Sequence, residues 1–179
     1  MSGLDPARLK VIFDRIEKMI EDRWGIPVRI ADVPNPFTGD LDGQQIHVDF
    51  DVEIEDALFI LVHLFGHTVQ WNLSAELREI AFLKPDGWTE DQLARLAAYE
   101  AEACQYSLQL LHDAGVFDLD QWMADFSACD SAYLMHFYRT GEKRPFRDFW
   151  RDGSPIIAPK PIPEFHPTAW VVRSDGVVI

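Results

Sequence analysis

The segment EDALFILVHLFGHTVQW, residues 55–71, decides how this chain folds. Its side chains are apolar almost all round at the helical period, which indicates a helix through the core rather than along its surface. Two imidazoles, His63 and His67, are spaced i and i+4, so they lie one turn apart on one face and can chelate a single Zn²⁺. Asp56 and Gln70 share this stripe, and we expect them to cap the helix or to support a histidine.

The histidine pair needs a context before it indicates metal binding. With six histidines in 179 residues, roughly one such sequence in six contains an i, i+4 pair by chance. A solvated stripe normally carries Lys, Glu or Arg, and this stripe carries none, which favours a buried site. The alternative stays open that His63 and His67 only pack in the core or face solvent.

A third ligand candidate lies on a later helix, which the capping box of Thr89 and Gln92 opens and which runs to Asp113. Glu100 shares a face of this helix with apolar and small side chains, so we expect it to be buried. An ionised carboxylate on an apolar face is costly without a cation, and a metal held by His63 and His67 would supply one.

The predicted metal ligands are therefore His63, His67 and Glu100, with a fourth position left for water. The competing interpretation pairs Glu100 with a cation such as Arg78 or Arg95.

Two residues close to Glu100 on the same helix are expected to have roles other than metal binding. Glu102 lies about 200° away from Glu100 on the helix, and we expect it in solvent, with a ligand or base role as the alternative. Cys104 lies among small and apolar neighbours and is expected to be a small buried thiol rather than a metal or redox residue.

The remaining pattern predicts a mainly helical α+β fold in a single domain, residues 1–179. Asp5 and Pro6 open a first amphipathic helix that ends at Gly25, and two strands follow. The expected segments are strands at 27–33 and 45–50, a helix from Asp118 or Asp120 to Arg139, a proline-rich arm at 155–167, and a terminal hairpin of 169–173 with 177–179.

The order of these segments resembles a known family. A helix, two strands with the pattern Ile46-His47-Val48, a core helix with HxxGH, and ExEAxxxSxxLL over 100–111 are similar to the ImmA/IrrE-type zincin-like metallopeptidases. The resemblance covers residues 5–115, followed by a helical part at 116–151 and the arm and hairpin at 152–179. It implies zinc held by a His, His, Glu set, with Gly66 as the small residue that lets the core helix pack closely.

The chain departs from that family at Leu64, where the family's HExxH motif has its general-base glutamate. A positioned base contributes typically about 10²–10⁴-fold, so the sequence predicts a metal-holding pseudoenzyme with little or no peptidase activity, which acts by binding a protein or peptide partner. It also predicts that Leu64→Glu restores part of the hydrolysis. Two alternatives remain: a hydrolase in which Glu102, Asp56 or a substrate group supplies the base, and a metal-free structural or interaction module.

The composition of the chain excludes some classes of ligand. Asp and Glu number 30 against 16 Lys and Arg, giving a net charge of −14 and a pI near 4.6, which disfavours nucleic acid and anionic membranes as ligands. Charged residues interrupt the first 21 positions, so no apolar core of a signal peptide can be drawn there and we do not expect export. No apolar run reaches the roughly 20 residues of a membrane span, so we do not expect insertion into a membrane. Two cysteines without a CxxC pair favour the cytoplasm. The oligomeric state is left open.

Overall fold

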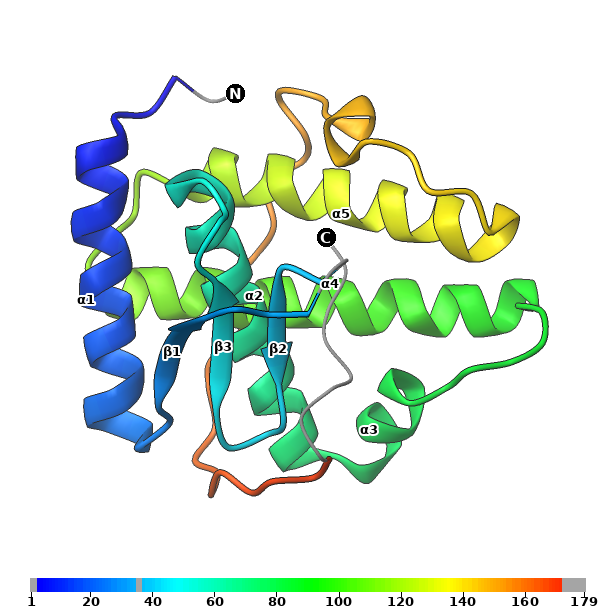
Figure 1. The fold of residues 1–179 in the computed structure, drawn as a ribbon, viewed down its shortest axis with the longest axis horizontal. Helices are drawn as coiled ribbons and strands as arrows, with labels where there is room; N and C mark the ends of the chain where they lie inside the picture. Colours follow the sequence, from blue (N-terminus) through cyan, green and yellow to red (C-terminus); the bar gives the residue numbers. More distant parts are fainter. Residues whose placement is uncertain (1–2, 35–36, 172–179) are drawn as a thin grey trace.

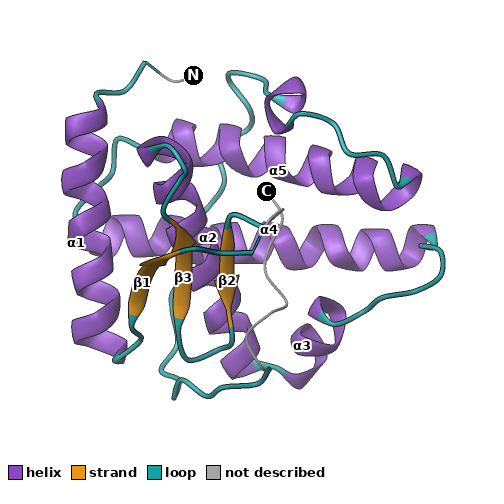
Figure 2. Ribbon diagram, viewed as in Figure 1, coloured by secondary structure: helices purple, strands orange, loops and turns teal. Residues whose placement is uncertain are grey.

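The structure of the protein is a computed structural model that describes residues 3–34 and 37–171. Helices make up 57% of the described residues, and a three-stranded sheet completes the mainly helical α+β fold that was predicted (Figure 1, Figure 2). The elements are α1 (Pro6–Trp24), β1 (Val28–Ala31), β2 (Gly39–Leu41), β3 (Ile46–Asp49), α2 (Ile54–Leu73), α3 (Ala75–Ala81), α4 (Glu90–Asp113), α5 (Asp120–Thr140) and a 3₁₀ turn at Phe146–Phe149.

Helix α1 begins and ends where its capping residues predict. The Asp5 carboxylate accepts a hydrogen bond from the Ala7 backbone N–H at 3.0 Å, and Pro6 occupies the first helical position. Gly25 closes the helix with a φ of 67°, a left-handed conformation that costs glycine little. The apolar face of α1 then packs against α2.

The sheet has the strand order β1-β3-β2, with β1 parallel and β2 antiparallel to β3. The two predicted strands are present as β1 and β3. Strand β2 was not predicted, because its three residues lie inside a segment rich in proline and glycine and become a strand only by pairing with β3. Figure 2 shows the sheet lying across α2, with α1 beside its β1 edge.

Helix α2 is the centre of the molecule. Its side chains are buried from Ala57 to Trp71, as the apolar pattern predicts. It packs against α1, α4 and the strands β2 and β3. Any polar side chain on α2 is therefore held inside the protein, and this fixes the positions of its two histidines.

Helices α4 and α5 run antiparallel beside each other (Figure 1). The capping box predicted for α4 is present, since the Thr89 hydroxyl accepts from Gln92 N–H and the Gln92 amide oxygen accepts from Thr89 N–H. The seven-residue helix α3 was not predicted; Ser74 caps its N-terminus by accepting from Leu77 N–H.

The proline-rich arm follows an irregular path over the surface, as predicted. Lys160 N–H donates to the carbonyl oxygen of Gln105 at 3.2 Å, and the Phe165 ring lies parallel to that of Trp24 at 6.4 Å. The predicted terminal hairpin includes residues 172–179, which lie outside the described part of the chain. None of the helices within the described ranges has both the length and the apolar character to span a bilayer.

Candidate metal centre

Three side chains predicted from the sequence meet in the interior. His63 and His67 of α2 have their Nε2 atoms 3.0 Å apart, and the Glu100 Oε2 of α4 lies 3.2 Å from the first and 3.1 Å from the second. Donor atoms 2.0–2.1 Å from a tetrahedral zinc ion are about 3.3–3.4 Å apart. The three donors therefore fit around one ion with a shift of a few tenths of an ångström.

Glycine at position 66 brings the two helices close enough for this meeting. A Cβ added to Gly66 would lie 2.2 Å from the carbonyl oxygen of Ala103, so no other residue fits there without moving the backbone. The Ser107 hydroxyl donates across the same contact to the carbonyl oxygen of Val62 at 2.8 Å. The small residue expected at position 66 is thus what sets the separation of α2 and α4.

Gln70 fixes the proton on His67. The amide nitrogen of Gln70 donates to the Tyr99 carbonyl oxygen at 2.8 Å and to the Glu102 carboxylate at 2.9 Å, and both of these partners accept only. The Gln70 oxygen therefore faces His67 Nδ1, 2.9 Å away, and takes its hydrogen. The lone pair of His67 is left on Nε2, directed at Glu100 and His63, as metal ligation requires.

The ring of His63 is held by two buried neighbours. It stacks on Phe59 with ring centroids 5.2 Å apart, and its Nδ1 lies 3.5 Å from the Cys104 sulfur. Cys104 is the buried thiol that was predicted, but its contact with the histidine was not. The Nε2 of His63 is again the nitrogen that faces the cluster.

A fourth group, Asp130 of α5, was missed by the sequence analysis. Its Oδ2 lies 3.7 Å from His63 Nε2, and the residue is 2% exposed. Its signal was available: Phe126, Tyr133 and Phe137 recur at helical spacing on α5, and Asp130 is a carboxylate on that apolar face. The reasoning applied to Glu100 would have selected it too.

The cluster perturbs the titration of its members. Burial alone would raise the pKa of Glu100, but the adjacent His67 and His63 imidazoles outweigh burial and lower the pKa to about 2. Burial would lower the pKa of His63, yet Cys104, Glu100 and Asp130 raise it well above its usual value. Burial raises the pKa of Asp130 to about 7, with His63 opposing and Glu100 reinforcing the rise.

Other candidate residues lie elsewhere. The prediction of a solvated Glu102 is wrong: its side chain is 23% exposed, forms an ion pair with Lys160 and accepts from Gln70. Asp56 neither caps α2 nor supports a histidine, because it pairs with Arg147 of the C-terminal segment. The supporting role expected of Asp56 or Gln70 belongs to Gln70.

The proposed cations for Glu100 are also engaged elsewhere. Arg78 donates to the Trp71 carbonyl oxygen, and Arg95 lies 3.7 Å from the Glu76 carboxylate. Glu100 therefore has imidazoles, not a guanidinium, as its charged partners in the described part of the chain.

Leu64 points away from the cluster. It is fully buried, and its Cδ1 would lie 2.8 Å from a Cβ added to Gly39 of β2, so its side chain faces the sheet. The position that holds the general base in HExxH proteins is here part of the contact between α2 and β2.

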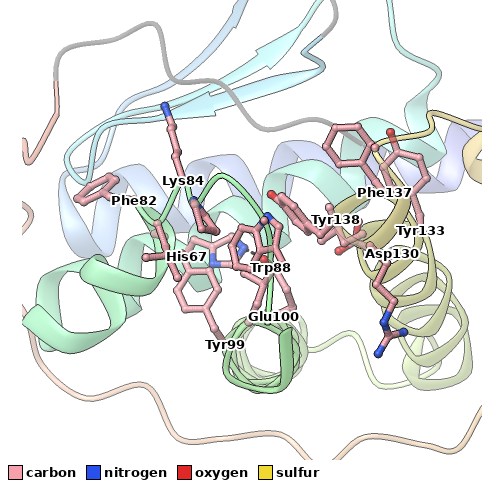
Figure 3. A pocket seen from close by; sticks show the side chains of 18 of the residues that line it. His67, Phe82, Lys84, Trp88, Tyr99, Glu100, Asp130, Tyr133, Phe137 and Tyr138 are labelled. Atoms are coloured by element: carbon pink, nitrogen blue, oxygen red, sulfur yellow. Dashed lines mark hydrogen bonds and ion pairs between the residues drawn. The ribbon is translucent and has the colours of Figure 1, made fainter. Parts of the chain in front are cut away.

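A cavity of about 870 Å³ reaches the cluster between α4, α5 and the loop that precedes α4 (Figure 3). His67, Glu100 and Asp130 reach it from three different helices. Its aromatic lining consists of Phe37, Trp71, Phe82, Trp88, Tyr99, Tyr133, Phe137 and Tyr138. Residues 155–167, the proline-rich arm, are not among those that line it. The cluster thus borders a cavity whose wall is rich in aromatic side chains.

Comparison of the chain with known protein families, with curated proteins and with solved structures gave no match. The three residues that could hold a metal ion, His63, His67 and Glu100, are therefore interpreted from their own geometry.

Proposed function

We propose that this protein holds one zinc ion through His63, His67 and Glu100 and acts by binding a protein or peptide segment in the adjoining cavity. On this proposal the chain is a degenerate, zincin-like pseudoenzyme with little or no peptidase activity. The bound ion would supply a positive charge to the buried carboxylates of Glu100 and Asp130.

The observation that carries the proposal is the orientation of His67. Its Nδ1 hydrogen is committed to Gln70, whose own amide group is fixed by Tyr99 and Glu102. A supporting acceptor on the outer nitrogen is the arrangement that metal-ligating histidines almost always have. A histidine that merely filled the core would not need three successive hydrogen bonds to direct its lone pair at a second imidazole and a carboxylate.

The cavity supports binding of an apolar segment. Its wall is rich in Phe, Tyr and Trp side chains, which bury large areas and dominate binding energies at interfaces. The net charge of −14 opposes a polyanionic ligand. We therefore propose a peptide or protein loop with aromatic or aliphatic side chains as the occupant.

Weak or absent hydrolysis follows from the surroundings of the ion. Leu64 faces the sheet, and the substitute bases considered from the sequence, Glu102 and Asp56, are held in ion pairs with Lys160 and Arg147. A hydrolase with another base is the alternative function. We also propose a cytoplasmic location, because Cys104 and Cys129 are both free, buried thiols.

Thermal melting with and without zinc tests the metal site. Metal that binds only the folded state stabilises it by RT ln(1 + [L]/Kd), so chelator-treated protein should melt at a higher temperature once zinc is restored. His63→Ala and Glu100→Gln should lose this response, whereas His136→Ala, on α5 outside the cluster, should keep it. An unchanged melting midpoint at saturating zinc would favour the alternative of a metal-free module in which His63 and His67 only pack in the core. Turnover of an unstructured peptide pool that depends on zinc and is lost in His63→Ala would favour the hydrolase.

A further inference from the structure

We propose that Asp130 is the fourth protein ligand of the metal ion, so that the coordination sphere is closed by side chains from α2, α4 and α5. This inference rests on the proposed metal site and adds a residue to it. A site with four protein ligands is of the structural type, whereas a catalytic zinc keeps one position for water.

The first argument is distance. The Asp130 Oδ2 lies 3.7 Å from His63 Nε2, within about 0.4 Å of the separation expected for two ligands of one tetrahedral zinc ion. The other three donors lie 3.0–3.2 Å apart, slightly closer than that separation. Asp130 lies outside the group of donors that are all within 4.8 Å of one another, so an ion at the centre would have to draw its carboxylate toward His67 and Glu100 while pushing the other three donors slightly apart.

The second argument is charge. Asp130 is 2% exposed, and within the described residues its charged neighbours are His63 and Glu100, with no lysine or arginine in contact. A buried carboxylate is costly unless it is paired or coordinates a metal. Two carboxylates and two neutral imidazoles around one divalent ion have no net charge. The protein therefore contains the donor set that neutralises such an ion.

The third argument is position on the chain. Asp130 lies on α5, while the other donors lie on α2 and α4. A fourth ligand on α5 would fasten the C-terminal helix to the rest of the core through the metal ion. The cavity wall formed by Tyr133, Phe137 and Tyr138 belongs to the same helix. Metal binding would then hold one wall of the cavity in place and would leave the ion without a reactive position.

A spectroscopic substitution tests the ligand assignment directly. Cobalt(II) takes the place of zinc, and a cysteine at position 130 that binds it adds a sulfur-to-cobalt charge-transfer band in the near ultraviolet. We expect this band in Asp130→Cys and not in the unmodified protein, in which Cys104 contacts His63 Nδ1 on the side away from the cluster. Cobalt bound by Asp130→Cys without the band would overturn the assignment.

Zinc affinity and hydrogen exchange give a second test that does not depend on cysteine. Asp130→Asn should bind zinc more than about 100-fold more weakly, a loss beyond the 10–100-fold typical of residues that only orient a ligand. Zinc should slow amide exchange in α5 of the unmodified protein and not in Asp130→Asn. Asp125→Asn is the matched control, because Asp125 is a second buried aspartate on α5 that bonds Gln121 and Ser154 instead.

The outcomes separate the two proposals. If the unmodified protein binds no zinc, the proposed function fails and the ligand assignment fails with it. If it binds zinc, but Asp130→Asn has the same affinity and the same zinc-dependent exchange in α5, the assignment alone is wrong and three protein ligands hold the ion.

Discussion

Gly66 of α2 and Ala103 of α4 approach so closely that a Cβ on the glycine would lie 2.2 Å from the alanine carbonyl oxygen. This contact sets the distance between the helix that carries His63 and His67 and the helix that carries Glu100. A backbone atom cannot swing away as a flexible side chain can. The geometry of the candidate metal centre therefore depends on a residue that is not itself one of the candidate ligands.

Gly66→Ala is expected to destabilise the fold and weaken metal binding together. Overpacking a tight contact costs about 1–3 kcal/mol, and the shift of α4 moves Glu100 away from both histidines. Gly87→Ala is the control, since a Cβ there has no atom within 4 Å, and it should change stability by no more than about 0.5 kcal/mol. Denaturant unfolding and a zinc titration measure the two effects. Normal zinc affinity in Gly66→Ala would show that the geometry of the metal site does not depend on the close packing at Gly66.

Leu64→Glu is now expected to destabilise the protein rather than to restore hydrolysis, in contrast to the expectation drawn from the HExxH pattern. Leu64 is fully buried against Gly39 of β2, so a glutamate there places a carboxylate in an apolar contact without a cation. Leu64→Met, which nearly conserves volume, should cost less than about 1.5 kcal/mol. Melting curves and a peptide-hydrolysis assay provide the comparison. A stable Leu64→Glu protein with zinc-dependent turnover would contradict this account.

Gln70→Ala is expected to weaken zinc binding about 10–100-fold while the ligands themselves remain. The substitution removes the acceptor that holds the Nδ1 hydrogen of His67, so Nε2 is no longer fixed as the free nitrogen. Gln109→Ala is a suitable control on the surface of α4, where Gln109 bonds Asp113. Competition with a chromophoric chelator gives both dissociation constants. Equal values would show that His67 needs no support from Gln70.

The stabilisation by zinc is expected to grow as the pH rises from about 5.5 to about 8. The raised pKa values of His63, and of Asp130 at about 7, mean that the metal-free folded protein binds more protons than the unfolded chain, so its stability falls as the pH passes through them. Glu100, with a pKa of about 2, contributes stability that is lost only at much lower pH.

Zinc requires unprotonated ligands, so its affinity increases over the same interval in which the metal-free protein loses stability. Melting temperatures with zinc and with chelator, measured across this range, give the comparison. A zinc-induced shift that is constant or shrinks toward higher pH would be inconsistent with ligation by His63.

Much of the fold followed from local signals in the sequence. Asp5 and Gly25 bound α1, Thr89 with Gln92 opens α4, and the apolar pattern of α2 shows that it is central. The helical spacing of His63 and His67 and the apolar face around Glu100 were enough to predict that these three side chains meet. Each of these signals acts within about one or two turns of helix and therefore does not depend on the tertiary structure.

The features that were missed depend on contacts between distant segments. Strand β2 exists by pairing with β3, and Glu102 leaves solvent because Lys160, 58 positions later, reaches it. Asp130 joins the cluster only when α5 packs against α4 in the right rotation. The apolar neighbours of Asp130 on its own helix could have marked it as a buried carboxylate, but they do not show which helix that face meets.

The metal content of the protein, purified without a metal-affinity step, tests the central claim most directly. The account predicts one zinc per chain by elemental analysis, lost in His67→Ala and retained in His136→Ala. Protein that holds no zinc, and that fails to keep any after incubation with equimolar zinc and desalting, would contradict it and leave His63, His67 and Glu100 as a buried hydrogen-bonded cluster.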